Sequence, residues 1–250
     1  ASSSARGTAS VSFSFTMSAV STNGETYSQS FRSSAAVITP VPVITMTQQA
    51  QANSNNPSVA SVGATLPTTL NPGDALLAVV ANATTSASVS LADTIGNTWN
   101  LVVSSSYPAF NQKLTAFATV NSTTLYATDT ITASFGAGAG YASIFVYEYR
   151  ENRGQSITFD ASSFATSTST QPSSGFANAT SAAELLVGVG YDGTTAEIPA
   201  AGPGFTLETS STVTHVFMED STQYITGPVA ATWQYSGTAP SSACYLATFY

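Results

Sequence analysis

The sequence is very poor in charge. Only 7% of its 250 residues are Asp, Glu, Lys or Arg, whereas about 25% is usual for a soluble protein. Five basic and thirteen acidic residues give a net charge of −8. This leaves no basic patch to neutralise phosphates, so we expect no nucleic-acid partner. The surface must be covered by hydroxyls, amides and glycine, and low charge favours association.

Cysteine and histidine are equally scarce. The single Cys244 excludes an internal disulfide framework and is expected to be a small buried residue. With one histidine, His215, a His/Cys metal site is excluded by count. A Ser-His-Asp triad would have to use His215, and no Gly-x-Ser-x-Gly motif nominates its serine. We therefore expect His215 on a strand surface.

Long hydrophobic runs and helical periodicity are also missing. The longest apolar run, residues 75–81, is far too short to cross a bilayer, so no membrane span is predicted. Apolar residues recur at every second position or continuously, between Gly, Pro, Asn and Asp. This pattern predicts an all-β fold, a two-layer antiparallel β-sandwich, jelly-roll-like in strand number, with an N-terminal extension strand.

What the sequence does have is an uninterrupted alternation over residues 8–19, in which hydroxyl residues separate apolar ones. The apolar positions are Ala9, Val11, Phe13, Phe15, Met17 and Ala19. Successive side chains of a strand point to opposite faces, so this segment predicts one long strand with an apolar face. Pro40 and Pro42 then favour a stiff, extended connector. We predict a donor strand at 1–20, a linker at 21–42 and a sandwich domain at 43–250.

The domain at 43–250 carries a series of weak motifs in a fixed order. They are Asn71-Pro-Gly-Asp-Ala-Leu-Leu-Ala-Val-Val, Asp93-Thr-Ile-Gly-Asn-Thr-Trp-Asn-Leu-Val, Val146-Tyr-Glu-Tyr, Ile157-Thr-Phe-Asp, Glu184-Leu-Leu-Val-Gly-Val-Gly, Gly202-Pro-Gly-Phe-Thr and Tyr245-Leu-Ala-Thr-Phe. This series resembles a β-sandwich domain of secreted and surface proteins of bacteria and archaea, which usually has no assigned activity. The first 42 residues are additional to it.

The layout of the whole chain resembles a second group of proteins. An alternating N-terminal tail before a Ser/Thr-rich sandwich is similar to the subunits of the archaeal surface filaments called threads, and more distantly to chaperone–usher pilins. The resemblance implies that the tail of each subunit completes the sheet of the next.

Several acidic residues are candidates for chemistry. A carboxylate pair for glycoside cleavage would come from Glu148, Glu151, Asp160, Glu184, Glu219 and Asp220. Glu148, between two tyrosines in an apolar strand, is the best candidate for a raised pKa. No two acids show a recognisable paired spacing, so we predict a protein that is not an enzyme. Four turn residues suit either calcium or ordinary turn capping: Asp74, Asp93, Asp160 and Asp192. We predict no metal and no cofactor.

Other residues leave two interpretations open. Trp99 and Trp233 suit either core packing or a sugar-stacking platform. Lys113, the only lysine, is either a solvated strand end or a partner in a Lys–Asn cross-link. Asn82, Asn121 and Asn178 begin Asn-x-Ser/Thr sequons and are candidates for N-glycosylation. The sequons, the hydroxyl-rich composition and a start at Ala1 without a leader favour an extracellular location.

Together these features predict a structural, pilin-like subunit of an extracellular cell-surface filament, concerned with adhesion and polymerising head-to-tail by strand donation. Its partner is a second copy of itself, with glycans as a further partner class. The alternative is a carbohydrate-binding, lectin-like sandwich of a surface protein, in which strand 8–19 folds back on its own domain.

Overall fold

The structure is a computed structural model. It describes residues 9–11, 14–20, 22–24, 26–32, 36–38, 43–120, 124–152, 156–181, 184–193, 197–211, 214–238 and 241–250. The chain divides into two compact units, Ala1–Pro42 and Val43–Tyr250. We call them the N-terminal unit and the body. The fold is 62% strand. The described residues contain no helix long and apolar enough to span a membrane.

The N-terminal unit is an antiparallel ribbon. Strand β1 (Ala9–Val11) pairs with β4 (Ala36–Ile38), and β2 (Ser14–Val20) pairs with β3 (Thr26–Arg32). The segment 21–42, expected as a linker, therefore contains two strands. The physical reason is a second alternation: Tyr27, Gln29 and Phe31 recur at every second position, opposite Ala19, Met17 and Phe15.

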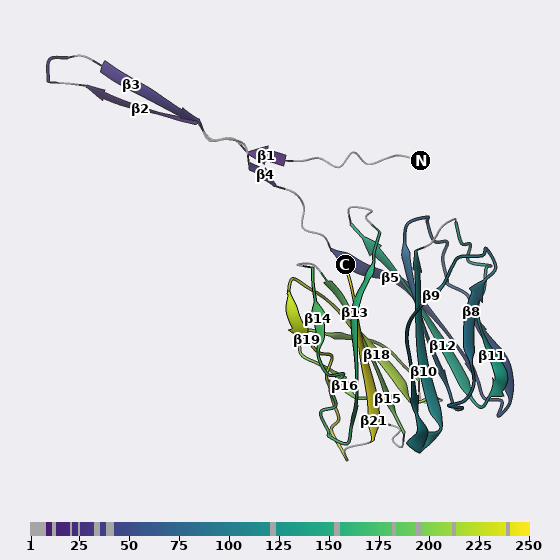
Figure 1. The fold of residues 1–250 in the computed structure, drawn as a ribbon. Helices are drawn as coiled ribbons and strands as arrows, with labels where there is room; N and C mark the ends of the chain where they lie inside the picture. The colour runs from purple at the N-terminus through teal and green to yellow at the C-terminus, as the bar shows by residue number, and fades with distance from the viewer. Residues whose placement is uncertain are drawn as a thin grey trace. The chain divides into compact units, whose positions relative to one another are not determined.

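The first half of the body has eight strands and one helical turn among its described residues (Figure 1). They are β5 (Ile44–Ser54), β6 (Val59–Ala64), β7 (Ala75–Asn82), β8 (Val89–Asp93), β9 (Asn100–Tyr107), η1 (Pro108–Phe110), β10 (Gln112–Val120), β11 (Ile131–Ala139) and β12 (Ala142–Glu151). One sheet has the order β5-β12-β7-β10-β9, and a smaller one has the order β6-β11-β8.

The described residues of the second half form nine strands. They are β13 (Phe159–Ser167), β14 (Ala177–Ala179), β15 (Glu184–Asp192), β16 (Ala200–Ala201), β17 (Thr206–Ser211), β18 (Val216–Gln223), β19 (Gly227–Val229), β20 (Trp233–Gln234) and β21 (Ser242–Phe249). The large sheet has the order β13-β21-β15-β18-β17, and β14-β19 and β16-β20 form two short pairs.

The two halves of the body are an internal structural repeat. The order β13-β21-β15-β18-β17 matches β5-β12-β7-β10-β9 strand for strand. The register matches too: Tyr149 of β12 pairs with Ala75, and Phe249 of β21 pairs with Leu185. The edge strands of both sheets have register shifts at corresponding places. Residue-by-residue equivalences between the halves follow from this shared register.

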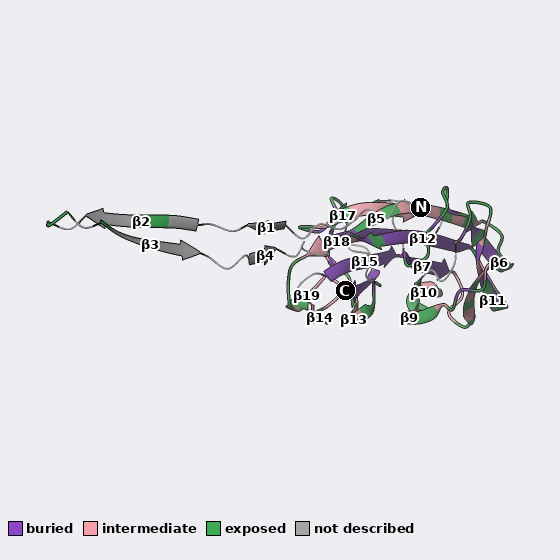
Figure 2. Cartoon of the chain, turned by 90° about the horizontal axis from the view of Figure 1, so that it is seen from above, coloured by how far each residue is buried: buried purple, intermediate pink, exposed green. Residues whose placement is uncertain are grey.

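Three apolar clusters hold these layers together. The largest lies between the two five-stranded sheets and includes Val79 and Val189 from their central strands. A second cluster joins the first sheet to β6-β11-β8, and a third covers the outer face of the second sheet with Trp233 and Tyr235. Strands β7 and β15 are therefore buried on both faces, which explains their continuous apolar runs (Figure 2). The predicted all-β antiparallel sandwich is confirmed, with further small sheets on its outer faces.

Candidate functional site

The sandwich has two long sides, which the internal repeat makes equivalent. On one side β5 of the first sheet meets β17 and β18 of the second. Gln49 Nε2 donates to Glu208 O at 3.3 Å, and Thr222 Oγ1 donates to Ile44 O at 2.6 Å. Tyr149 OH adds a bond to Asp220 Oδ2 at 3.0 Å. Polar contacts thus close this side.

The other side, where β9 lies near β13, is open. A pocket of about 340 Å³ enters between the two five-stranded sheets there. Its walls are mainly apolar and include Val102, Ala118, Val120, Ile157, Phe159 and Phe249. A narrower depression continues past Phe164 and Tyr245. We call the two together the β9–β13 groove.

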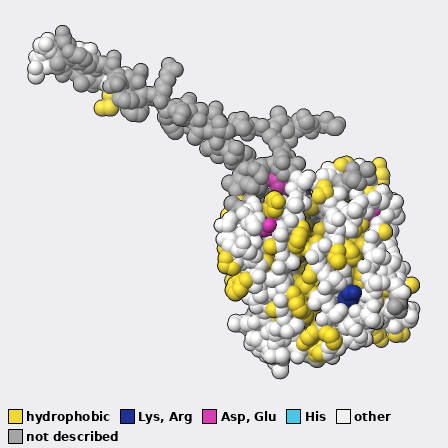
Figure 3. All heavy atoms as spheres, viewed as in Figure 1, with side chains coloured by type: hydrophobic (Ala, Val, Ile, Leu, Met, Phe, Trp, Pro, Cys, Tyr) yellow, Lys and Arg dark blue, Asp and Glu magenta, His cyan; other side chains and the backbone are white. Residues whose placement is uncertain are grey.

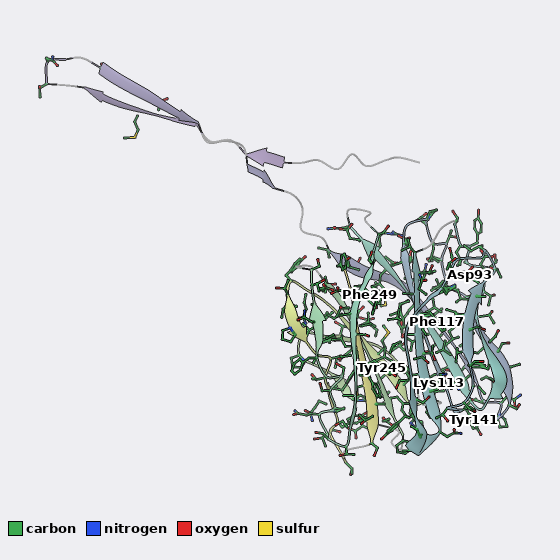
Figure 4. The ribbon with its side chains drawn as sticks, viewed as in Figure 1. Asp93, Lys113, Phe117, Tyr141, Tyr245 and Phe249 are labelled. Atoms are coloured by element: carbon green, nitrogen blue, oxygen red, sulfur yellow. The ribbon has the colours of Figure 1, made fainter. Side chains whose placement is uncertain are left out.

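The groove exposes hydrophobic surface. Phe159 is 39% exposed and Phe164 42% exposed, although both pair with core residues of β21. Phe159 packs on Phe249 with ring centroids 5.8 Å apart, and Phe164 on Tyr245 at 4.7 Å. In Figure 3 a band of hydrophobic side chains follows the boundary between the two halves. In Figure 4 Tyr245 and Phe249 mark the β21 side, and Lys113 and Phe117 mark β10.

The equivalent positions on the closed side carry different residues. Phe164 stands opposite Tyr245, and its equivalent Gln51 stands opposite Phe145. Phe159 stands opposite Phe249, and its equivalent Met46 stands opposite Tyr149. One edge of the repeat therefore exposes two phenylalanines where the other has a glutamine and a partly buried methionine. The groove was not predicted from the sequence, in which its signal is two phenylalanines in the Ser/Thr-rich segment 159–167.

Lys113 lies at the far end of the groove, in its narrower part. Its Nζ donates to Ala87 O at 3.0 Å, and in the sheet it stands opposite Asn82. The residues that line the wide pocket include no Asp, Glu, Lys or Arg among those that the structure describes.

Three pairs of acidic residues lie close together in the body. Glu148 lies beside Asp74, Glu184 beside Asp160, and Asp220 beside Glu208, and in each pair the second acid adds to the raised pKa of the first. Burial raises the pKa of Glu184 to about 7, and the neighbouring Asp160 adds to the rise. Burial and then Glu208 raise the pKa of Asp220 to about 7. Burial also raises the pKa of Glu219 to about 8.

Arg150 organises the first pair. Its Nε donates to Asp74 Oδ1 at 2.8 Å and its Nη2 to Asp74 Oδ2 at 2.6 Å, a bidentate contact. Burial by itself would raise the pKa of Asp74, but the hydrogen bonds to its carboxylate, first those from Arg150, together outweigh this effect and lower the pKa. Burial, then Asp74, raises the pKa of Glu148, as its sequence position predicted. Among the described residues, no acid of the three pairs lines the wide pocket or the narrower depression of the β9–β13 groove.

The predicted donor residues lie in the N-terminal unit. Ala9 and Val11 are in β1, and Phe15, Met17 and Ala19 are in β2. Phe13 lies outside the described residues. Met17 is 64% exposed.

The three glycosylation candidates differ in their surroundings. Asn82 is fully buried, and its Nδ2, the atom that would carry a glycan, donates to Thr84 O at 2.7 Å. Asn178 is exposed in β14, between two buried alanines. Asn121 lies outside the described residues. The structure thus offers Asn178 as the described sequon that reaches solvent.

The remaining candidates have structural roles. Trp233 is buried, and Trp99 is half-buried with its Nε1 donating to Asp93 Oδ2 at 3.0 Å. Asp93 and Asp160 also accept bonds from the backbone amides of Asn97 and Thr180. Those parts of the chain that the structure describes contain no group of three His, Cys, Asp or Glu suited to a metal.

His215 and Cys244 sit in the second half of the body. His215 Nδ1 lies 3.6 Å from Asp192 Oδ1 in the turn before β18. Cys244 is fully buried in β21.

Comparison with protein-family models, characterised proteins and solved structures gives no match for this chain.

Proposed function

We propose that this protein is the structural subunit of an extracellular filament, which grows when the N-terminal strand of one copy joins the fold of the next. The observation that carries the proposal is the N-terminal ribbon. It forms a unit separate from the body, and its alternating strand β2 leaves Met17 64% exposed. An isolated two-stranded ribbon is marginally stable in water, so it gains stability by adding to a larger sheet.

The energetics favour such a joint. Burying Val11, Phe15 and Met17 in a neighbour contributes roughly 1.5–3 kcal/mol for each side chain. Ordering the segment and immobilising the subunit oppose this gain, so the net free energy of the joint is smaller than the sum. A subunit that donates at one place and accepts at another makes a head-to-tail contact, which need not close and so produces a fibre.

Composition fits the same function. A subunit with 7% charged residues has little electrostatic repulsion to prevent association. Hydroxyl groups and glycans keep such a surface hydrated, and adhesion is the use that we propose for the filament.

The test is electron microscopy and light scattering of the purified chain and of two variants. Phe15→Asp places a charge on the apolar positions of β2, and Ser14→Asp places it on the neighbouring hydroxyl position. We expect filaments from the unchanged chain and from Ser14→Asp, and a loss of at least tenfold in polymer for Phe15→Asp, because a buried charge costs several kcal/mol. A chain that stays monomeric and is retained on a sugar column would instead support the lectin-like alternative.

A further inference from the structure

We propose that the β9–β13 groove is the acceptor site, and that its occupant is the segment 9–20 of a second copy of this chain. The inference rests on the proposed function and adds the place on the body where the donated strand binds. The supporting observation is that the β5–β17 side of the body is closed, whereas the equivalent β9–β13 side is open.

The two sides of the body differ although their strand order is the same. The repeat makes the β5–β17 side and the β9–β13 side equivalent, yet only the first is joined by the bonds from Gln49 and Thr222 described above. On the second side the sheets leave an apolar pocket of about 340 Å³. A pocket of this kind that stays open to water leaves unfavourable apolar surface exposed, so it is expected to be covered in the assembled state.

The chemistry of the walls selects the occupant. Phe159 and Phe164 offer aromatic surface beside the pocket, and the described lining of the wide pocket carries no charged side chain. Residues 8–20 likewise contain no Asp, Glu, Lys or Arg, and place an apolar residue at every second position from 9 to 19. An apolar, uncharged segment therefore meets a wide pocket whose described walls are mainly apolar and carry no charged side chain.

The free strand edges beside the groove favour an extended chain as the occupant. β9 and β13 are terminal strands of their sheets within the described residues, so each has an edge free for hydrogen bonds. β9 has 8 residues and β13 has 9, so either strand can pair with most of the 12-residue segment 9–20. An extended chain gains both main-chain pairing on such an edge and pockets for alternate side chains, which a compact apolar ligand does not.

The experiment uses full-length chains with matched substitutions at equivalent positions. Phe164→Asp alters the groove, and Gln51→Asp alters the same position of the closed side. Both residues are exposed, so both variants should fold, and circular dichroism checks this. We expect Phe164→Asp to reduce polymer at least tenfold at pH 7 and Gln51→Asp to reduce it less than twofold.

A cross-linking experiment tests the contact directly. Met17→Cys chains are mixed with differently tagged Phe164→Cys chains, or with Gln51→Cys chains as the control, and native Cys244 is fully buried. Heterodimers linked through Phe164→Cys but not Gln51→Cys would support the groove. Polymer that forms normally from Phe164→Asp, or cross-links preferring Gln51→Cys, would overturn the groove and leave strand donation intact. A parent chain that never polymerises would overturn the proposed function itself.

Discussion

Asp74 and Glu184 occupy equivalent positions in the two halves of the body. Asp74 directly precedes Ala75, and Glu184 directly precedes Leu185, the residue equivalent to Ala75. Both are buried, and each has a second carboxyl group beside it, from Glu148 and from Asp160. Asp74 has an arginine against it, in the bidentate contact with Arg150. At this position one half places a cation beside the carboxyl group, whereas in the other half burial raises the pKa of the carboxyl group to about 7.

The first prediction is that the fold is most stable in mild acid. The folded-state pKa values of Glu184 and Glu219, about 7 and about 8, lie above the ordinary value of 4.5. The unfolded chain therefore releases protons between about pH 4.5 and 8 that the folded chain retains, and stability falls as the pH rises through that range. Asp74 and Asp160, whose pKa values are lowered, act in the opposite direction below about pH 4.

Chemical denaturation at a series of pH values measures this dependence. We expect the free energy of unfolding to peak near pH 4–5 and to fall on the order of a few kcal/mol by pH 8. Glu219→Gln should flatten the slope between pH 5 and 8. Cooperative unfolding between about pH 5 and 3 would contradict the prediction.

The second prediction concerns Arg150. Arg150→Met removes the cation from Asp74 and Glu148 and leaves two buried carboxyl groups together. Because the arginine side chain is 45% exposed, we expect a loss of about 2 kcal/mol at pH 7, below the full cost of breaking a buried pair. At pH 3 the loss should be smaller, because both carboxyl groups can bind protons once the arginine is gone. Arg150→Lys is the control, since it keeps the charge and loses the bidentate geometry; an equal effect at both pH values would refute this view.

Much of the fold could be predicted from the sequence. The alternation in residues 8–19 and the continuous runs of β7 and β15 indicate strands directly, because side-chain periodicity follows from backbone geometry. The ribbon partner β3 was missed because Tyr27 and Phe31 lie among polar residues and their pairing depends on contacts with β2.

The repeat and the groove could not be predicted in this way. The two halves use different side chains at equivalent places, such as Val80 and Gly190, so the register reveals the repeat while residue identity hides it. The groove depends on how two sheets separate along one side, which no local pattern encodes. Of the candidate acids, only the raised pKa of Glu148 followed from its neighbours in sequence.

The third prediction separates two sequons. If the native protein carries N-glycans, peptide mass spectrometry should find them on Asn178, which is exposed, and not on Asn82, whose amide is buried and bonded. Asn178→Gln should remove the modification with little effect on stability. Asn82→Gln should destabilise the fold whether or not glycans are present, because a longer side chain has no room in a fully buried site. A glycan on Asn82 of the folded protein would refute this placement.

The last prediction tests the repeat through its packing. In the outer layer of the second sheet Gly190 faces Phe217, and a Cβ on Gly190 would lie 1.8 Å from the ring. Their equivalents in the first half are Val80 and Thr115, so one half pairs a glycine with a large ring where the other pairs two medium side chains. Gly190→Ala should therefore cost about 3 kcal/mol, at the upper end for an overpacked core.

Compensation makes this prediction specific. Phe217→Leu replaces the ring with a smaller side chain and should recover part of the lost stability in the double variant. The changes in the free energy of unfolding of the two single variants will therefore not add. Gly136→Ala is the control, because this exposed glycine meets only the movable Ser88 hydroxyl, and it should change the free energy of unfolding by less than about 1 kcal/mol. If Gly190→Ala proves as mild as Gly136→Ala in urea denaturation, the close approach of β15 to Phe217 is not a feature of the folded protein.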